Sequence, residues 1–428
     1  MSKITPEFKK DIPTSGAKVR HIVLTLLFFL SIIVYLDRVC ISVMGKRIKA
    51  DLDLSNEQFG WVLGAFALSY AIFEIPTGIM GDKFGPRKVL SRVVLWWSFF
   101  TALTGAANGL ISLLIIRFLF GAGEAGAYPN SSIVVSKWFP KYETGRAQSF
   151  IWAAGRIGGA LAPLIVVPIA IAFGWRSSFY FMGFIGVVWV GIWFTWFRDT
   201  PAQMRSVTQN ELQEIQSNQQ IRSGDHRIPW KKFFRSSNII SLMLMFHFFM
   251  YGAYFFSAWL PTYLQEGRHF SEEDMKLFAT LPFALGAIGC FAGGFLSDYL
   301  VKKKGLKYGR RAVGLVSMGL SSLIVLLAAL TKDNETAAIM LAVGMAFKDF
   351  TLPVAFATCI DIGRSRAGLV AGAMNFAGQL GAFFLAIAFG KIVDSTGNYN
   401  LPLYFIAIVL FLSSLLWLRI NPEQTVKD

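Results

Sequence analysis

Long apolar runs recur along the whole chain, and they constrain its fold more than any other feature. Each run is long enough to cross about 30 Å of hydrocarbon as a helix. Only 16% of the 428 residues are charged, whereas soluble domains contain about 25%. The runs predict an all-α membrane protein with twelve transmembrane helices, at residues 21–43, 57–80, 89–107, 110–134, 145–172, 176–197, 238–265, 275–299, 312–331, 336–360, 367–390 and 401–420.

A polar stretch at residues 198–236 interrupts the apolar pattern midway along the chain, and its segment 208–220 is expected to form a surface helix. A polar linker between two sets of six helices is typical of a duplicated membrane architecture. We therefore expect two pseudo-symmetric six-helix bundles with cytoplasmic connecting segments: 1–20 (N-terminal tail), 21–197 (N-terminal bundle), 198–236 (linker), 237–420 (C-terminal bundle) and 421–428 (C-terminal tail).

Lysine and arginine gather in alternate loops, as at 83–88, 137–146 and 302–311, while the other loops mix them with acids. The first of those other loops is an exception, with Arg47 and Lys49 among its basic residues. Because cytoplasmic loops carry the basic excess, both termini are expected in the cytoplasm. The same rule explains the net charge of +15. No nucleic-acid partner is expected, since these charges lie at helix ends rather than on one patch.

The three cysteines, Cys40, Cys290 and Cys359, fall in expected membrane segments without metal-ligand spacing. We therefore expect neither a metal site nor a cofactor. No nucleotide-binding loop, catalytic triad or zinc spacing is visible, which argues against an enzyme. The first apolar run continues into a polytopic pattern and is interpreted as a retained span rather than a signal peptide.

A glycine- and aspartate-containing motif follows the second expected helix and returns in part after the eighth. The first copy contains Gly78, Asp82, Gly85 and Arg87, and the second keeps Asp298. This pattern resembles the signature loop of the major facilitator superfamily, which joins the second and third helices of each half. The resemblance implies the major facilitator fold. A gating role suits the motif, because a carboxylate at a helix end beside a basic turn can hold neighbouring helices in one packing and release them in another. A simple topology anchor is the alternative.

Ionisable residues lie inside several expected helices, where such groups are costly and tend to mark substrate paths or proton relays. Arg117 and Glu124 leave the same face of one helix, because seven residues make nearly two turns. A buried structural ion pair is the alternative interpretation. The ionisable and polar candidates are Tyr35, Asp37, Arg38, Tyr70, Glu74, Arg117, Glu124, Arg156, Tyr251, Tyr254, Lys348, Asp349, Asn375 and Gln379.

Several of these residues resemble the pattern of the anion:cation symporter family, which includes bacterial sugar-acid and hexuronate proton symporters. The resemblance covers essentially the whole chain, and the Arg-x-x-x-Gly-x-Gly-Glu run at 117–124 is its most specific part. It implies proton-driven uptake of a small organic anion, with Asp37 and Glu124 as the proton-coupling groups. Arg38 and Arg117 would face the anion or balance charge. The positions that carry the resemblance are Tyr35, Asp37, Arg38, Tyr70, Arg117, Glu124 and Asn375.

The chemistry of these side chains fits such a role independently. Burial favours the protonated form of a carboxyl group, whereas a neighbouring arginine favours the carboxylate. Arginine stays charged and presents a planar fork that matches a carboxylate. We hypothesise that Arg117 pairs with Glu124 in the empty protein and with the substrate once Glu124 is protonated.

Two residues depart from the sugar-acid members of that family. Arg156 stands where those members generally have a neutral polar residue, and Lys348 with Asp349 is unusual in the tenth span. The extra positive charges favour a substrate with more than one anionic group, such as a dicarboxylate, a citrate-like compound or a carboxylate-rich metal chelate. The alternative is that Lys348 and Asp349 neutralise each other, although adjacent helical residues diverge by about 100°.

The expected function is import of a small organic anion with protons by alternating access, in a protein of the inner (plasma) membrane that works as a monomer. The substrate site, which includes Tyr251, Tyr254 and Gln379, is expected at the midplane between the halves. An organophosphate:phosphate antiporter or an exporter is the alternative. Glu74 could support the gating loop or touch substrate, and His247 is expected to have a packing role.

Overall fold

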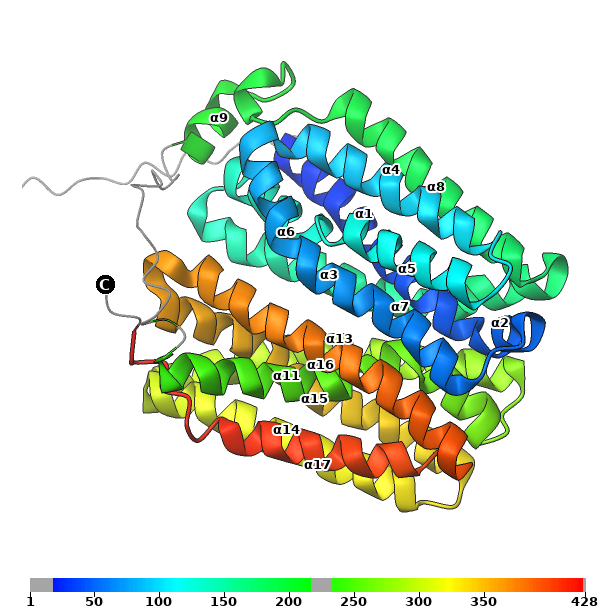
Figure 1. Cartoon of the computed structure of the whole chain (residues 1–428). Helices are drawn as coiled ribbons and strands as arrows, with labels where there is room; N and C mark the ends of the chain where they lie inside the picture. Colours follow the sequence, from blue (N-terminus) through cyan, green and yellow to red (C-terminus); the bar gives the residue numbers. More distant parts are fainter. Residues whose placement is uncertain (1–17, 217–232, 234, 426–428) are drawn as a thin grey trace, which may run out of the picture.

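The structure is a computed structural model that describes residues 18–216, 233 and 235–425 (Figure 1). Within these residues every regular element is a helix. Ten helical spans there are long and apolar enough to cross a membrane: α1 (Val19–Val43), α3 (Asn56–Phe84), α5 (Leu110–Glu124) continued by α6 (Ala127–Trp138), α7 (Lys141–Phe173), α8 (Trp175–Trp196), α11 (Ser237–Ala258), α13 (Glu272–Lys304), α14 (Leu306–Leu330), α15 (Asn334–Gly363) and α16 (Ala367–Thr396).

Two further apolar helices run alongside these ten. The helix α4 (Pro86–Thr104) packs against α8, and the shorter α17 (Leu401–Leu416) packs against α14. Two small helices lie at the ends of the molecule: α2 (Gly45–Leu52) and α9 (Gln209–Gln216). The helix α9 falls inside the segment 208–220 for which a surface helix is expected; residues 217–220 of that segment lie outside the described residues.

Two expected spans are broken in the structure. Residues 110–134 form α5 and α6, which meet at Ala125 and Gly126. The expected span 238–265 is interrupted: α11 stops at Ala258, and the short α12 (Leu260–Thr262) and the π-helical η2 (Tyr263–Gly267) follow. Pro261 contributes to this break, since proline has no N–H to donate to the carbonyl four residues earlier and its ring crowds that carbonyl.

The helices of the first half of the chain lie together in the upper part of Figure 1, and those of the second half lie below them. The two groups meet where α3 packs on α16 and α7 packs on α13. Glycine permits this close approach: a Cβ on Gly60 would lie 2.5 Å from the carbonyl oxygen of Ala386. At the second contact, a Cβ on Gly159 would lie 2.5 Å from the ring of Phe283.

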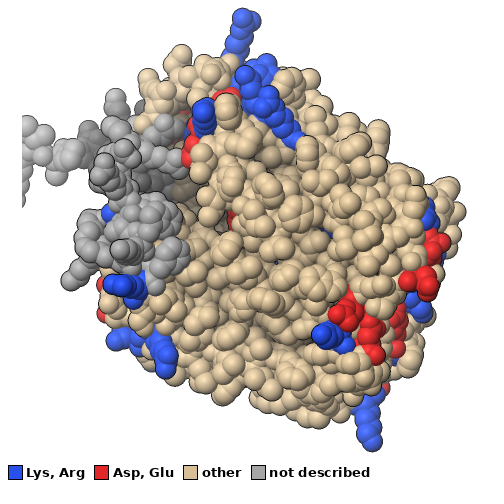
Figure 2. Space-filling view, viewed as in Figure 1, with Lys and Arg blue, Asp and Glu red and all other residues tan. Residues whose placement is uncertain are grey.

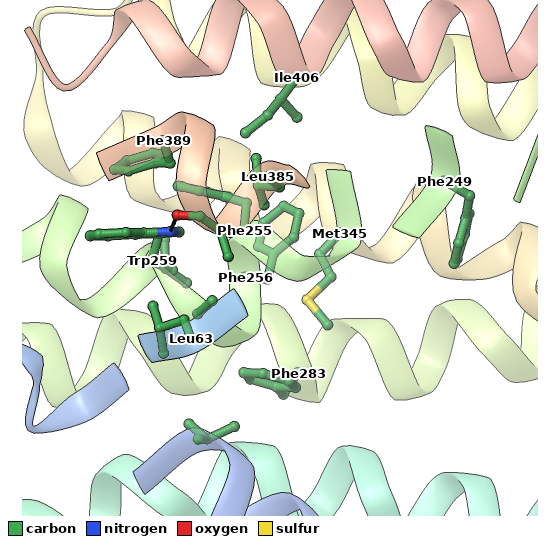
Figure 3. Packing of buried hydrophobic residues seen from close by; sticks show 14 of the residues in the cluster. Leu63, Phe249, Phe255, Phe256, Trp259, Phe283, Met345, Leu385, Phe389 and Ile406 are labelled. Carbon is green, nitrogen blue, oxygen red and sulfur yellow. Dashed lines mark hydrogen bonds between the residues drawn. The ribbon is translucent and has the colours of Figure 1, made fainter. Parts of the chain in front are cut away.

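Aromatic packing closes the space between the halves near α2 and α12 (Figure 3). The ring of Trp259 stacks on Phe389 with a centroid distance of 4.7 Å and meets Phe59 of the other half edge-on at 5.8 Å. The Trp259 indole N–H donates to the carbonyl of Ala386 at 3.1 Å. The rings of this cluster are buried and make contacts between the two halves. They form an aromatic seal at that end of the molecule.

Charged side chains gather at the two ends of the molecule, and the face between them is almost uncharged (Figure 2). At the end that carries α2, Arg47 pairs with Glu272 at 2.7 Å and Lys49 pairs with Glu266 at 2.7 Å, both across the halves. An apolar belt between two charged rims is the surface expected of a protein that crosses a bilayer.

The opposite end carries α9, which packs against the start of α1. Glu211 accepts the backbone N–H groups of Val19 and Arg20 at 3.2 and 3.1 Å. The guanidinium of Arg20 pairs with Glu214 of α9 and with Glu143 of α7, at 3.0 and 2.9 Å. The bonds to Glu211 satisfy free N–H groups at the start of α1, as an N-cap does.

Candidate functional site

A cavity of about 590 Å³ lies between the two halves, within the range of small-molecule sites. It extends from Leu63 and Ala258, beside the aromatic seal, to Asp82 and Gly368 at the end where α9 lies. The structure brings together seven of the residues predicted for substrate binding in its lining: Tyr35, Arg38, Tyr70, Arg156, Tyr254, Asn375 and Gln379.

Arg38 projects from α1 to the cavity and binds the carboxylate of Glu124 through its Nε. The guanidinium also lies over the rings of Tyr70, Phe66 and Tyr35, at 4.8, 5.3 and 5.5 Å from their centroids. Glu124 is 0% exposed. One face of Arg38 is therefore directed at the cavity while its Nε holds a buried carboxylate.

The expected pair between Arg117 and Glu124 is wrong in this conformation, because Glu124 binds Arg38 instead. Seven residues correspond to about 10.5 Å along a helix axis, which is farther apart than side chains that pair at i, i+4 spacing. Arg117 is buried and lies over the rings of Phe120 and Phe66 at 4.3 and 5.1 Å. Arg117 does not line the cavity.

Asp37 is buried beneath the cavity lining and is not part of it. The side chains of Trp97, Arg117 and Glu124 interact with its carboxyl group. A carboxylate buried this deeply is costly to keep charged, and the proton-coupling role of Asp37 stays a prediction.

Arg156 lines the cavity from α7 and reaches across to the other half, where its Nη2 lies 3.0 Å from the Asp349 carboxylate. Lys348 holds the same carboxylate at 2.6 Å. Lys348 is 1% exposed and does not line the cavity. In this conformation Lys348 therefore does not face the cavity, contrary to the prediction, and it pairs with Asp349, whose carboxylate is shared with Arg156. The flexible lysine stem brings Nζ back to its neighbour despite the angular divergence of the two positions.

Glu74, ranked below the main candidates from sequence, lines the cavity and connects the two halves. Its carboxylate accepts from the amide of Asn375 on α16, with N–O distances of 2.7 and 2.6 Å. A carboxylate on α3 and an amide on α16 thus meet across the interface between the halves.

Tyr128 and Trp152 also line the cavity, and the sequence analysis missed them. Their rings stack with a centroid distance of 4.6 Å, and the Tyr128 hydroxyl bonds Ser31 at 2.9 Å. A signal for Trp152 was present, since it stands four residues before Arg156 and so shares its helix face. Gly155 leaves room here, because a Cβ on it would lie 2.8 Å from the ring of Tyr35.

Two other residues singled out from the sequence lie outside the cavity lining. Tyr251 is partly buried against the apolar core rather than in the lining. His247 hydrogen-bonds the carbonyl of Ala377 at 2.8 Å and contacts the ring of Phe384. This environment fits the packing role expected for His247.

The predicted gating loop joins α3 to α4 at the α9 end of the cavity, which Gly78 and Asp82 line. Gly85 turns the chain with a φ of +84°, a conformation that favours glycine. The backbone N–H of Arg87 donates to Asp199 at 2.8 Å.

The related motif of the second half makes its own contacts. Asp298 pairs with Arg310 at 3.0 Å, and Arg310 also binds Asp361 at 3.0 Å. Both loops therefore tie neighbouring helices together at one end of the molecule. No group of three or more metal-ligating side chains occurs among the residues that the structure describes.

Comparison with known proteins gives the chain a family. The model of the Major Facilitator Superfamily matches residues 27–386. A "Probable sulfoacetate transporter" of Cupriavidus necator is 35% identical, over 96% of this chain and 95% of that protein. A "Hexuronate transporter" of Bacillus subtilis is 31% identical, over 88% of this chain and 89% of its own length.

Solved structures have the same fold. A bacterial homologue of the human lysosomal transporter Spinster aligns with a TM-score of 0.75 at 20% identity, over 95% of this chain and 97% of that one. A D-xylose–proton symporter aligns with a TM-score of 0.73 at 15% identity, over 95% and 99% of the two chains. The relatives are transporters rather than enzymes, and the chain is a multi-pass protein of the inner (plasma) membrane. The chain belongs to the Major Facilitator Superfamily, in the group that resembles sugar-acid and organic-anion transporters of the anion:cation symporter type.

Proposed function

We propose that this protein imports a small organic anion together with protons, by alternating access of the cavity between its halves. The observation that carries the proposal is the pair of arginines, Arg38 and Arg156, that line this cavity while each holds a buried carboxylate. A fixed guanidinium in a largely apolar cavity attracts an anion and cannot lose its own charge.

The architecture proposed for this function has twelve spans, namely the ten long apolar ones with α4 and α17. They form two six-helix bundles at residues 21–197 and 237–420, joined by the linker 198–236. The tails 1–20 and 421–428 lie with the linker in the cytoplasm, as the basic loops favour. In this orientation the cavity opens to the cytoplasm, and the bonds of Arg47 and Lys49 close the outer side. One copy of the chain supplies the whole cavity, which supports a monomeric unit.

Proton coupling is proposed to centre on Glu124 and its partner Arg38. When Glu124 takes a proton, Arg38 loses its carboxylate partner and becomes free to bind the anionic group of the substrate. When the substrate leaves, Arg38 recovers Glu124 as the proton departs. Asp37 is proposed as a second proton-binding group, and Arg117 balances the buried charge between them.

The substrate is proposed to carry two anionic groups, one for each cavity arginine. The sulfoacetate of the relative's name has this form, with a carboxylate at one end and a sulfonate at the other. Polar lining groups of Tyr70, Tyr254 and Gln379 would orient the molecule between the arginines. A dicarboxylate fits the same description.

The test uses purified protein in proteoliposomes with labelled sulfoacetate and succinate. We expect an inward proton gradient to drive accumulation, and a protonophore to abolish it. In Glu124→Gln, gradient-driven uptake should fall to background while counterflow exchange continues. Driven uptake at the wild-type level in that variant would contradict the assignment of Glu124.

The alternatives predict different results in the same vesicles. An organophosphate:phosphate antiporter would exchange external substrate for internal phosphate without moving protons. An exporter would accumulate substrate inside inverted membrane vesicles. The gradient-driven uptake expected here distinguishes import with protons from both alternatives.

A further inference from the structure

We propose that Asp349 competes with the substrate for Arg156, and that Lys348 is the counter-ion that allows Arg156 to leave Asp349. Asp349 thereby becomes a residue that determines specificity for the second anionic group. The inference rests on the proposed function and adds a residue that the expected substrate-binding set lacks.

The order of the three side chains carries the inference. Arg156 lines the cavity and is 11% exposed, whereas Asp349 and Lys348 are 0% and 1% exposed and lie behind it. The carboxylate of Asp349 is thus held from the cavity side by Arg156 at 3.0 Å and from the protein side by Lys348 at 2.6 Å. An anion that enters the cavity meets Arg156 first.

The cost of an unpaired buried charge explains why Arg156 and Lys348 share the carboxylate of Asp349. Removing the only partner of a buried charge is strongly unfavourable, because the charge is left without compensation. If Arg156 were the sole partner of Asp349, every substrate that bound Arg156 would incur this cost. Because Lys348 remains at 2.6 Å, the carboxylate keeps a cation when Arg156 turns to the substrate.

The surroundings hold the competing carboxylate in place. A Cβ on Gly286 of α13 would lie 2.6 Å from Oδ2 of Asp349, so glycine leaves the room that the carboxylate occupies. Lys348 Nζ lies 4.8 Å from the ring centroid of Phe249 and 5.9 Å from that of Phe256. The lysine is therefore bonded to its neighbour and covered by α11 rings, of which Phe249 lines the cavity.

The experiment measures binding of sulfoacetate and, as a matched monoanion, acetate to purified wild type and three variants. In Lys348→Met, Arg156 becomes the only cation beside Asp349, and we expect sulfoacetate to bind at least tenfold more weakly while acetate changes less than threefold. In Asp349→Asn the competitor is gone, and sulfoacetate should bind several-fold more tightly than to wild type. The double variant Asp349→Asn with Lys348→Met should bind sulfoacetate at least as tightly as wild type, which rescues the lysine variant.

The double variant also controls for folding, because it removes both members of a buried pair together. A purely structural role predicts that all three variants lose binding, with the double variant no better than Lys348→Met, and that result would overturn the inference alone. Equal loss of acetate and sulfoacetate in Lys348→Met would do the same. If wild type binds neither probe nor succinate, the proposed function fails and the inference falls with it.

Discussion

The two ion pairs beside the cavity differ in where their members come from. Arg38 and Glu124 both belong to the first half of the chain, on α1 and α5. Arg156 and Asp349 belong to different halves, on α7 and α15. Each pair consists of an arginine that lines the cavity and a carboxylate that is 0% exposed.

This difference suggests a division of tasks. A pair inside one half keeps its geometry when the halves move, so it can exchange a proton for an anion at any stage of the cycle. A pair between the halves exists only while the two halves are close together at the position of the pair. The strength of the ion pair therefore depends on the conformation of the protein and on what occupies the cavity. We therefore propose that the first pair serves proton coupling and the second serves substrate selection.

The largest effect is expected from Arg38→Gln, which leaves Glu124 as a buried carboxylate without its cation. The variant loses the anion-binding group and leaves the buried Glu124 carboxylate unpaired. Because bonds to buried charges are strong, uptake should fall on the order of 100-fold or more. Initial uptake rates in proteoliposomes measure this. A variant within threefold of wild type would contradict the role of Arg38.

A smaller and more selective effect is expected from Gly286→Ala, which places a methyl group against the Asp349 carboxylate. Overpacking of this kind costs roughly 1–3 kcal/mol, and 1 kcal/mol is about a factor of five, so the affinity ratio of sulfoacetate to acetate should change at least about fivefold. Acetate uptake driven by protons should stay near the wild-type level.

The matched control for that change is Gly294→Ala, on the same helix, where the nearest atoms to a Cβ lie 3.8 Å away on Pro353. It should leave the ratio unchanged. An equal shift in both glycine variants would assign the effect to α13 as a whole rather than to Asp349.

The outer ion pairs should have a modest effect on conformation. The Arg47–Glu272 pair is partly exposed, and such a pair contributes about 0–1 kcal/mol. Lys49 is 8% exposed, but Glu266 keeps the Tyr399 hydroxyl as a partner when Lys49 is replaced. Arg47→Gln combined with Lys49→Gln should therefore shift the balance toward an outward-open state only several-fold. Distances between spin labels at Lys46 and Glu273 would report the shift. An unchanged distance distribution would mean that the aromatic seal around Trp259 alone closes this end.

The smallest effect concerns the docking of α9 near neutral pH. The hydrogen bond from Arg20, with those from Lys18 and Tyr142, lowers the pKa of Glu214 to about 2, below its value of about 4.3 in an unfolded chain. Because the pKa of Glu214 is lower in the folded state, its bonds stabilise the docking of α9. This stabilisation is complete above about pH 4.3 and is lost as the pH falls through 2.

We therefore expect a fluorescence-measured distance between labels on α9 and α7 to stay constant from pH 8 to pH 5. Glu214→Gln should lengthen or broaden that distance already at pH 7. A wild-type transition between pH 6 and pH 7 would show that another group controls the docking.

The sequence predicted the helices well because a span needs about twenty apolar residues, and that length is visible locally. Seven of the ten residues that it predicted for substrate binding line the cavity. It did not predict the partners of the charges. Glu124 binds a residue 86 positions away, and Asp349 binds one 193 positions away. Such pairs depend on how helices pack, which local spacing does not contain.

The break between α5 and α6 has the same origin. The run 110–134 is continuously apolar. Its local sequence does not distinguish a glycine at which the helix breaks from a glycine that only allows close packing. Glu74 was undervalued for a related reason. Its closeness to the gating loop was visible in the sequence, whereas its bond to Asn375 of the other half was not.

The most direct test of the central claim compares two variants with two substrates in one proteoliposome assay. Proton-driven uptake and counterflow of acetate and sulfoacetate are measured for Glu124→Gln and Arg156→Gln. The account predicts that Glu124→Gln loses driven uptake of both anions and keeps counterflow of both. Arg156→Gln should keep proton-driven acetate uptake and lose about tenfold or more of its sulfoacetate uptake. Driven accumulation in Glu124→Gln, or equal loss of both anions in Arg156→Gln, would contradict it.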